Sequence, residues 1–114
     1  MRPDVTTAFI SHPACLLHET GSDHPESKQR LYAIEDALIS AGLMNLLHRF
    51  EAPCATREQL GRVHSPEYIK QIEHLAPPTG LVSLDTDTVM GPESLEAACR
   101  AAGAMVQGVD MAIN

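Results

Sequence analysis

The spacing of apolar residues predicts one strand at the start of the chain and a helix after it. The run VTTAFI, residues 5–10, combines β-branched and aromatic side chains over a short span, which is typical of a strand. A loop with two prolines, a glycine and three histidines follows. From residue 28 onward, apolar positions recur at spacings of three and four, at Leu31, Ile34, Leu38 and Ala41. This pattern predicts an amphipathic helix, which Gly42 is placed to end.

Start signals predict two more short helices in the middle of the chain. Thr56 followed three residues later by Gln59 has the spacing of a capping box. Ser65 is a good N-cap, and Pro66 would then occupy the first helical position of SPEYIKQIEHL. The sequence PPTG at residues 77–80 breaks this helix, and the short apolar run LVSL follows it.

A long helix is predicted from Pro92 nearly to the end of the chain. Its predicted apolar face consists of Leu95, Ala98, Ala102, Met105, Val109 and Ala112. Small residues between positions 97 and 104, including Gly103, would let a neighbouring backbone approach closely. We therefore expect other elements to pack on this helix.

Composition favours a single globular domain and makes some functions improbable. The chain has 114 residues, of which 44% are hydrophobic and 20% are charged. Its net charge is −7, and it shows no basic patch interleaved with aromatic residues, so nucleic acid is not an expected partner. Three widely spaced cysteines argue against a disulfide framework and a thiolate zinc site. With no signal peptide and no membrane-spanning run, the expected location is cytoplasmic.

The stretch SLDTDTVM, residues 83–90, allows three interpretations from its residues alone. A calcium-binding EF-hand loop starting at Asp85 is disfavoured, because Val89 and Met90 stand where an oxygen ligand and a glycine are required. DTDTV resembles the nucleophile motif of haloacid dehalogenase-type phosphatases, although only one predicted helix follows it. In the third interpretation Asp85, Asp87 and Thr88 form side-chain-to-backbone turns before the last helix.

Four segments in one order resemble the N-terminal part of the histone deacetylase family, particularly its bacterial deacetylase and acetylpolyamine amidohydrolase-like members. They are HPESKQR at 24–30, ATREQLGRVHSPEYI at 55–69, LDTDT at 84–88 and AAGAMVQGVD at 101–110. The resemblance implies an α/β arginase–deacetylase fold, with a mostly parallel sheet between two helical layers. Residues 1–114 would be an incomplete N-terminal part of that domain. The alternatives are the phosphatase and a non-catalytic helical interaction module.

The resemblance implies a zinc-dependent hydrolase of acetylated lysine side chains or acetylpolyamines. In this family zinc polarises the amide carbonyl and activates a water, a histidine pair transfers protons and a tyrosine stabilises the oxyanion. The chain contains no Asp-x-His and no His-His sequence. We therefore expect no catalytic residue and no metal ligand in this chain, zinc only in the complete protein, and no activity from the 114 residues alone.

The resemblance assigns roles to four residues outside the metal site. Asp87 matches the loop aspartate that holds the substrate backbone at the tunnel rim, while Asp85 is expected to be a turn residue. Arg30 matches an arginine of the internal channel, although Lys28 stands where the family usually has proline. His18 and His24 are expected in the loop at the tunnel rim. The even spacing of His12, His18 and His24 on a Pro/Gly loop lacks the geometry of a metal site.

Overall fold

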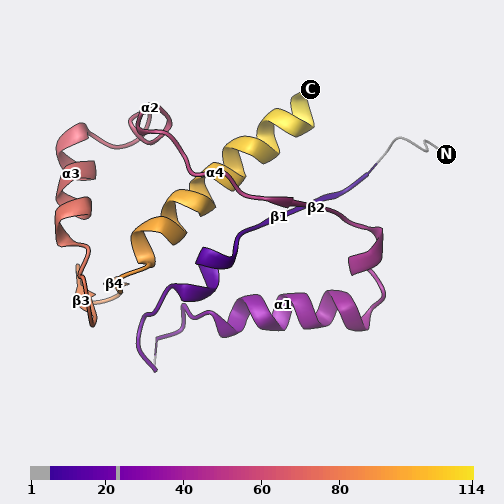
Figure 1. The fold of residues 1–114 in the computed structure, drawn as a ribbon, viewed down its shortest axis with the longest axis horizontal. Coiled ribbons are helices and arrows are strands. Elements are labelled where there is room, and N and C mark those ends of the chain that lie inside the picture. Colours follow the sequence, from indigo (N-terminus) through magenta and orange to yellow (C-terminus); the bar gives the residue numbers. More distant parts are fainter. Residues whose placement is uncertain (1–5, 23) are drawn as a thin grey trace.

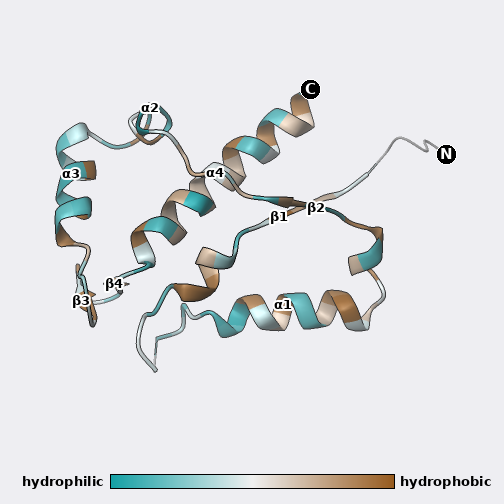
Figure 2. Cartoon of the chain, viewed as in Figure 1, coloured by the Kyte–Doolittle hydropathy of each residue, from teal (hydrophilic) through white to brown (hydrophobic). Residues whose placement is uncertain are grey.

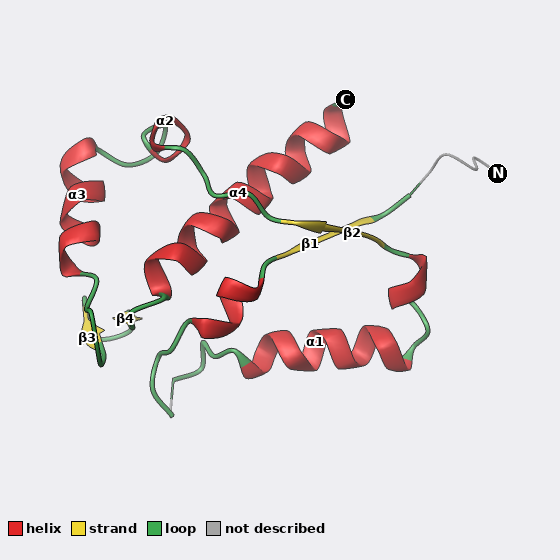
Figure 3. Cartoon of the chain, in the orientation of Figure 1, coloured by secondary structure: helices red, strands yellow, loops and turns green. Residues whose placement is uncertain are grey.

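A computed structural model describes residues 6–22 and 24–114 of the chain. Figure 1 shows how the elements are arranged, and Figure 3 separates helices from strands. The strands are β1 (Ala8–Ser11), β2 (His48–Glu51), β3 (Val82–Ser83) and β4 (Val89–Met90). The helices are α1 (Gln29–Ser40), α2 (Arg57–Leu60), α3 (Pro66–Leu75) and α4 (Ser94–Ile113), with 3-10 turns η1 (Pro13–Leu17) and η2 (Met44–Leu46).

A parallel pair of strands, β1 and β2, runs through the middle of the molecule (Figure 1). The register pairs Ala8 with His48 and Ser11 with Glu51, and α1 makes the crossover connection that a parallel pair requires. The predicted strand at 5–10 is confirmed over Ala8 to Ile10, whereas Val5 lies outside the described residues. Strand β2 was not predicted, because its sequence HRFE is short and mostly charged or polar.

The predicted ends of the first long helix are confirmed. Helix α1 spans Gln29–Ser40, and Gly42 follows it with a φ of +74°, a left-handed conformation that glycine adopts without steric cost. The Leu43 N–H then donates to the Leu38 carbonyl at 2.9 Å, which satisfies one of the free carbonyls at the helix end. Gly42 thus turns the chain toward η2 and β2.

Both predicted helix caps in the middle of the chain are present. The Thr56 hydroxyl accepts from the Gln59 N–H at 3.1 Å, and the Gln59 side chain accepts from the Thr56 N–H at 2.9 Å. The Ser65 hydroxyl accepts from the Tyr68 N–H at 3.1 Å, with Pro66 at the start of α3. These local bonds satisfy N–H groups that have no partner inside their own helices.

The apolar run LVSL belongs to a separate small hairpin. Strands β3 and β4 are antiparallel, with Val82 paired to Met90 and Ser83 to Val89. The Leu84 N–H donates to the Thr88 carbonyl at 2.8 Å, which closes the five-residue turn at 84–88. We call residues 84–88 the hairpin loop.

Helix α4 packs against η1, β1 and the extended segment 52–55. The Ala55 N–H donates to the Cys99 carbonyl at 3.0 Å, and the Arg100 guanidinium donates to the Ala52 carbonyl at 3.1 Å. A Cβ atom built on Gly103 would lie 1.8 Å from the Pro53 carbonyl oxygen. The predicted close approach of a neighbouring backbone is therefore confirmed at Gly103, where a side chain would not fit.

The predicted apolar face of α4 remains open within the described part of the chain. The buried residues of α4 are Ser94, Ala97 and Gly103, whereas Met105 and Val109 are 70% and 51% exposed. The N-terminal half of the predicted face borders one hollow, and the C-terminal half borders a second hollow of about 880 Å³ between β1, α1 and α4. Figure 2 shows that hydrophobic residues recur along both long helices, α1 and α4.

The described chain is more extended than a self-contained domain of its length. Its radius of gyration is 16.2 Å, against roughly 13 Å for a compact domain of this size. The buried apolar residues are few and mostly small: Ala14, Ala52, Ile69, Met90 and Ala97. None of the helices within residues 6–22 and 24–114 is long and apolar enough to cross a membrane.

We predict opposite effects for two Gly→Ala substitutions in α4. Gly103→Ala places a methyl group against the Pro53 backbone and should destabilise the whole protein by about 2–3 kcal/mol. Gly108→Ala meets only the Ile10 side chain, at 3.6 Å, and should stabilise it by up to about 1 kcal/mol through helix propensity. Urea unfolding measures the free energy of unfolding of both variants. Equal values would contradict the close contact between Gly103 and the Pro53 backbone.

Candidate functional site

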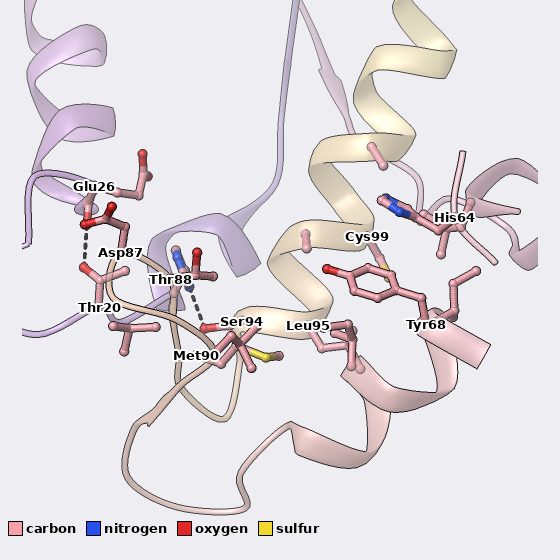
Figure 4. A pocket seen from close by; sticks show the side chains of 18 of the residues that line it. Thr20, Glu26, His64, Tyr68, Asp87, Thr88, Met90, Ser94, Leu95 and Cys99 are labelled. Carbon is pink, nitrogen blue, oxygen red and sulfur yellow. Dashed lines mark hydrogen bonds between the residues drawn. The ribbon is translucent and has the colours of Figure 1, made fainter. Parts of the chain in front are cut away.

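A hollow of about 530 Å³ lies between the N-terminal half of α4, helix α3, the β3–β4 hairpin and the loop that precedes α1. We call the described residues between η1 and α1, 18–22 and 24–28, the first loop. The walls are mainly aliphatic, whereas polar side chains gather at the edge formed by the first loop and the hairpin loop (Figure 4). The polar residues at this edge are His18, Thr20, His24, Glu26, Asp87, Thr88 and Ser94.

His24 joins the first loop to the hairpin loop. Its Nε2 lies 2.6 Å from the Asp87 carbonyl oxygen, and its Nδ1 accepts from the Glu26 N–H at 3.0 Å. Thr20 holds the same loop from within, because its buried hydroxyl donates to the Glu26 carbonyl. Segments 63 residues apart in sequence thus meet at one edge of the hollow.

His18 joins the same loop to the start of α4. Its Nδ1 lies 2.5 Å from the hydroxyl oxygen of Ser94, a residue that is only 5% exposed. The Ser94 hydroxyl also accepts from the Gly91 N–H at 2.8 Å, so it ties the end of the hairpin to the helix. The structure therefore brings His18, His24 and Asp87 to one hollow. Their roles at a tunnel rim remain predictions.

The two aspartates of the hairpin loop have different environments. The Asp85 carboxylate accepts from the Asp87 N–H at 2.8 Å, which forms the side-chain-to-backbone turn expected of this residue. This bond, with a second from the Thr88 hydroxyl, lowers the pKa of the Asp85 carboxyl. Among residues 6–22 and 24–114, no side chain forms an ion pair or hydrogen bond with the Asp87 carboxylate. Of the two aspartates, Asp87 is thus the one whose carboxylate has no side-chain partner among the described residues.

Arg30 does not line this hollow. Its side chain is 54% exposed, and its guanidinium lies 3.1 Å from the carboxylate of Glu26, four residues earlier along the chain. Such exposed pairs contribute little to stability. The internal-channel role of Arg30 stays a prediction that rests on its motif alone.

The opposite side of the hollow contains three residues that were not predicted as site residues. His64 and Tyr68 have ring centroids 5.1 Å apart, and Cys99 faces them from α4 (Figure 4). Burial raises the pKa of the Cys99 thiol, so the neutral form is favoured. His64 and Tyr68 are four residues apart at the start of α3, so the sequence indicates that the two rings lie on the same side of the helix. The sequence could not show which other element these rings face.

The described residues do not form a zinc site. Across residues 6–22 and 24–114, no group of three or more His, Cys, Asp or Glu side chains has a geometry that could hold a metal ion. Each of the three evenly spaced histidines uses at least one ring nitrogen within the chain. His12 Nδ1 accepts from the Ala14 N–H, His18 Nδ1 bonds the Ser94 hydroxyl, and His24 bonds Glu26 and Asp87. The described side chains therefore supply no ligand group that fits the zinc that the resemblance implies.

Comparison with known families settles the relationship of this chain. The family model for the histone deacetylase domain matches residues 24–114, which include the first loop from His24, the hairpin loop and all of α4. The chain belongs to the histone deacetylase family. The motif DTDTV accordingly lies in a hairpin of a deacetylase-type domain, and the phosphatase alternative finds no support.

Individual relatives agree with this family assignment. The chain is 39% identical over 111 residues to an uncharacterized protein of Synechocystis, covering 94% of this chain and 36% of that protein. It is 31% identical over 124 residues to a histone deacetylase-like amidohydrolase of Pseudomonas aeruginosa, covering 91% of this chain and 32% of that protein. The chain thus spans about a third of the length of these relatives.

A solved structure shows the same fold. The crystal structure of the HDA15 HD domain superposes with a TM-score of 0.72 at 27% identity, covering 88% of this chain and 30% of that one. The predicted α/β class is confirmed, and the parallel β1–β2 pair with its helices is part of the histone deacetylase fold. In the view of Figure 1, α1 and α4 lie on opposite sides of that pair.

We predict that the Asp85 carboxyl titrates below its ordinary pKa of 3.8 in the folded protein. A lowered folded-state pKa means that the turn contributes stability above pH 3.8, and that this contribution is lost as the pH falls through the folded-state value. Carboxyl carbon shifts followed by NMR measure this titration. Thr88→Val should raise the Asp85 pKa only part of the way, because the backbone bond from Asp87 remains. A normal pKa in the unaltered protein would contradict the turn.

Proposed function

We propose that the whole protein is a zinc-dependent deacetylase-type amidohydrolase that removes acetyl groups from lysine side chains or polyamines. Membership of the histone deacetylase family supports this reaction class. In the proposal the present segment is the N-terminal part of the domain. It supplies the loops at the tunnel rim and the helices that pack the domain, while the metal site comes from other residues.

One observation carries the assignment of a binding role to this segment. The family-matched region brings Asp87 to the edge of a hollow beside His18 and His24, with its carboxylate exposed and unpaired among the described residues. An ionised carboxylate only accepts hydrogen bonds, and its two oxygens can take two N–H donors from an extended substrate. We propose that Asp87 holds the substrate backbone in this way.

The polarity of the hollow fits such a substrate. Among the residues that line it, Glu26 and Asp87 carry carboxylates, and no lysine or arginine is present. The aliphatic walls from α3 and α4 can cover apolar parts of a ligand. A peptide amide or a polyamine ammonium group would therefore find the Asp87 carboxylate as an acceptor at the edge, whereas the Glu26 carboxylate already pairs with Arg30.

We predict that Asp87→Asn lowers kcat/KM for an acetyl-lysine peptide by about 10- to 100-fold. Hydrogen bonds to charged groups contribute ~1.5–3 kcal/mol, and each 1.4 kcal/mol corresponds to about tenfold. The loss should lie mainly in KM, because the contact is made equally in the ground state and the transition state. The measurement is steady-state hydrolysis by the whole, zinc-loaded protein, with an acetylpolyamine as the second substrate.

Asp85→Asn is the matched control for this experiment. An asparagine amide oxygen can still accept from the Asp87 N–H, so kcat/KM should change less than about threefold. If Asp87→Asn kept wild-type KM, or if Asp85→Asn had the larger effect, the role of Asp87 would be refuted. Absence of hydrolysis of both acetylated substrates would refute the proposed reaction.

We also predict that zinc is required by the whole protein and is not bound by residues 1–114 alone. Removal of zinc with a chelator should abolish deacetylation, and added zinc should restore it. Equilibrium dialysis of the 114-residue polypeptide should show no equimolar zinc, because its described side chains form no group of metal ligands. Stoichiometric zinc in that polypeptide, or hydrolysis by it, would contradict the proposal.

A further inference from the structure

The His24 side chain makes one hydrogen bond within the first loop and a second to the hairpin loop. Its Nδ1 accepts from the Glu26 N–H, and a backbone N–H can only donate. Nδ1 must therefore carry no proton. In the neutral ring the proton then belongs to Nε2, the tautomer assigned from this bonding pattern, and Nε2–H donates to the Asp87 carbonyl at 2.6 Å.

Asp87 is held through its main chain on both sides. Its N–H donates to the Asp85 carboxylate at 2.8 Å, and its carbonyl accepts from His24. The first bond lies within the hairpin loop, whereas the second joins the Asp87 main chain to the first loop. Removing the His24 bond would leave the Asp87 main chain held by the bond within its own loop.

We propose that His24 is a positioning residue that sets the direction of the Asp87 carboxylate for substrate binding. This inference rests on the proposed function, since Asp87 must bind substrate for its direction to matter. His24 itself need not touch the substrate. A carboxylate that is already oriented loses less conformational freedom when the ligand binds, so loosening it weakens binding.

Two substitutions of His24 separate the two bonds. In His24→Asn the amide oxygen stands near the position of Nδ1, so the contact with Glu26 survives while the donor to Asp87 is lost. In His24→Gln the amide nitrogen stands near the position of Nε2, so a donor to Asp87 remains while the local acceptor is lost. If His24 only stabilised the first loop, His24→Gln would be the more harmful substitution, because it removes the acceptor for the Glu26 N–H.

We predict that His24→Asn raises KM by about 5- to 10-fold with kcat within about twofold of wild type, the size expected for loss of one hydrogen bond. His24→Gln should keep KM within about threefold of wild type. In an Asp87→Asn background, His24→Asn should add little further change, because both substitutions act on the same contact. His48→Asn, at the exposed start of β2, is the control for loss of a histidine.

A second measurement does not depend on activity. Hydrogen exchange of the Leu84 and Asp87 amides, both hydrogen-bonded within the hairpin loop, should speed up in His24→Asn and not in His24→Gln or His48→Asn. If both His24 variants raised KM equally, or if exchange in the hairpin loop stayed at wild-type rates in His24→Asn, the positioning role would be overturned. If Asp87→Asn left KM unchanged, the proposed function would fail at that residue, while the exchange experiment would still report whether His24 holds the loop.

Discussion

The crossing of segment 52–55 over α4 is the contact on which the rest of the arrangement depends. Gly103 leaves room for the Pro53 carbonyl, and hydrogen bonds at Cys99 and Arg100 hold the backbone on either side. The segment leads from β2 into α2, so the crossing fixes the central strands and the α2–α3 unit to one helix. A side chain at position 103 would separate these elements by the thickness of a methyl group, which a close-packed contact does not tolerate.

The same helix organises the polar edge from its other end. Ser94, at the first turn of α4, bonds both His18 and the Gly91 N–H, so the first loop and the hairpin meet at the helix start. The hollow then lies along α4 between this polar edge and the side chains of α3. The shape of the hollow follows from one long helix, with the first loop and the hairpin at its start and the extended segment 52–55 crossing its middle.

The two aspartates at the polar edge, Asp85 and Asp87, differ in what their carboxylates contact. Asp85 uses its charge locally, in a turn that keeps its pKa low, whereas Asp87 has its main chain bonded and its carboxylate exposed. Family membership comes from residues 24–114, which contain both loops of this edge. Deacetylation by the whole protein remains a proposal. In that proposal, this segment would bind and orient the substrate.

Local signals in the sequence determined the ends of α1 and α3, both helix caps, the turn at Asp85 and the family relationship. These features depend on residues a few positions apart, or on the order of motifs, and both can be read along the chain. Strand β2 and the hairpin pairing of β3 with β4 escaped prediction. HRFE and the short run LVSL take their conformations from distant or cross-turn partners, and their own periodicity is too short to show them.

Only the tertiary structure decided which side chains meet. The sequence placed His18 and His24 in one loop and Asp87 in another, far along the chain, and the structure joins the two loops. The channel role of Arg30 stays a prediction, and in the structure its side chain pairs with Glu26. The sequence also predicted one continuous apolar face on α4, whereas the described chain covers the side with Ala97 and Gly103 and leaves Met105 and Val109 exposed. Periodicity shows that a helix has an apolar face. Which face is covered depends on partners whose distance in sequence is unrelated to their distance in space.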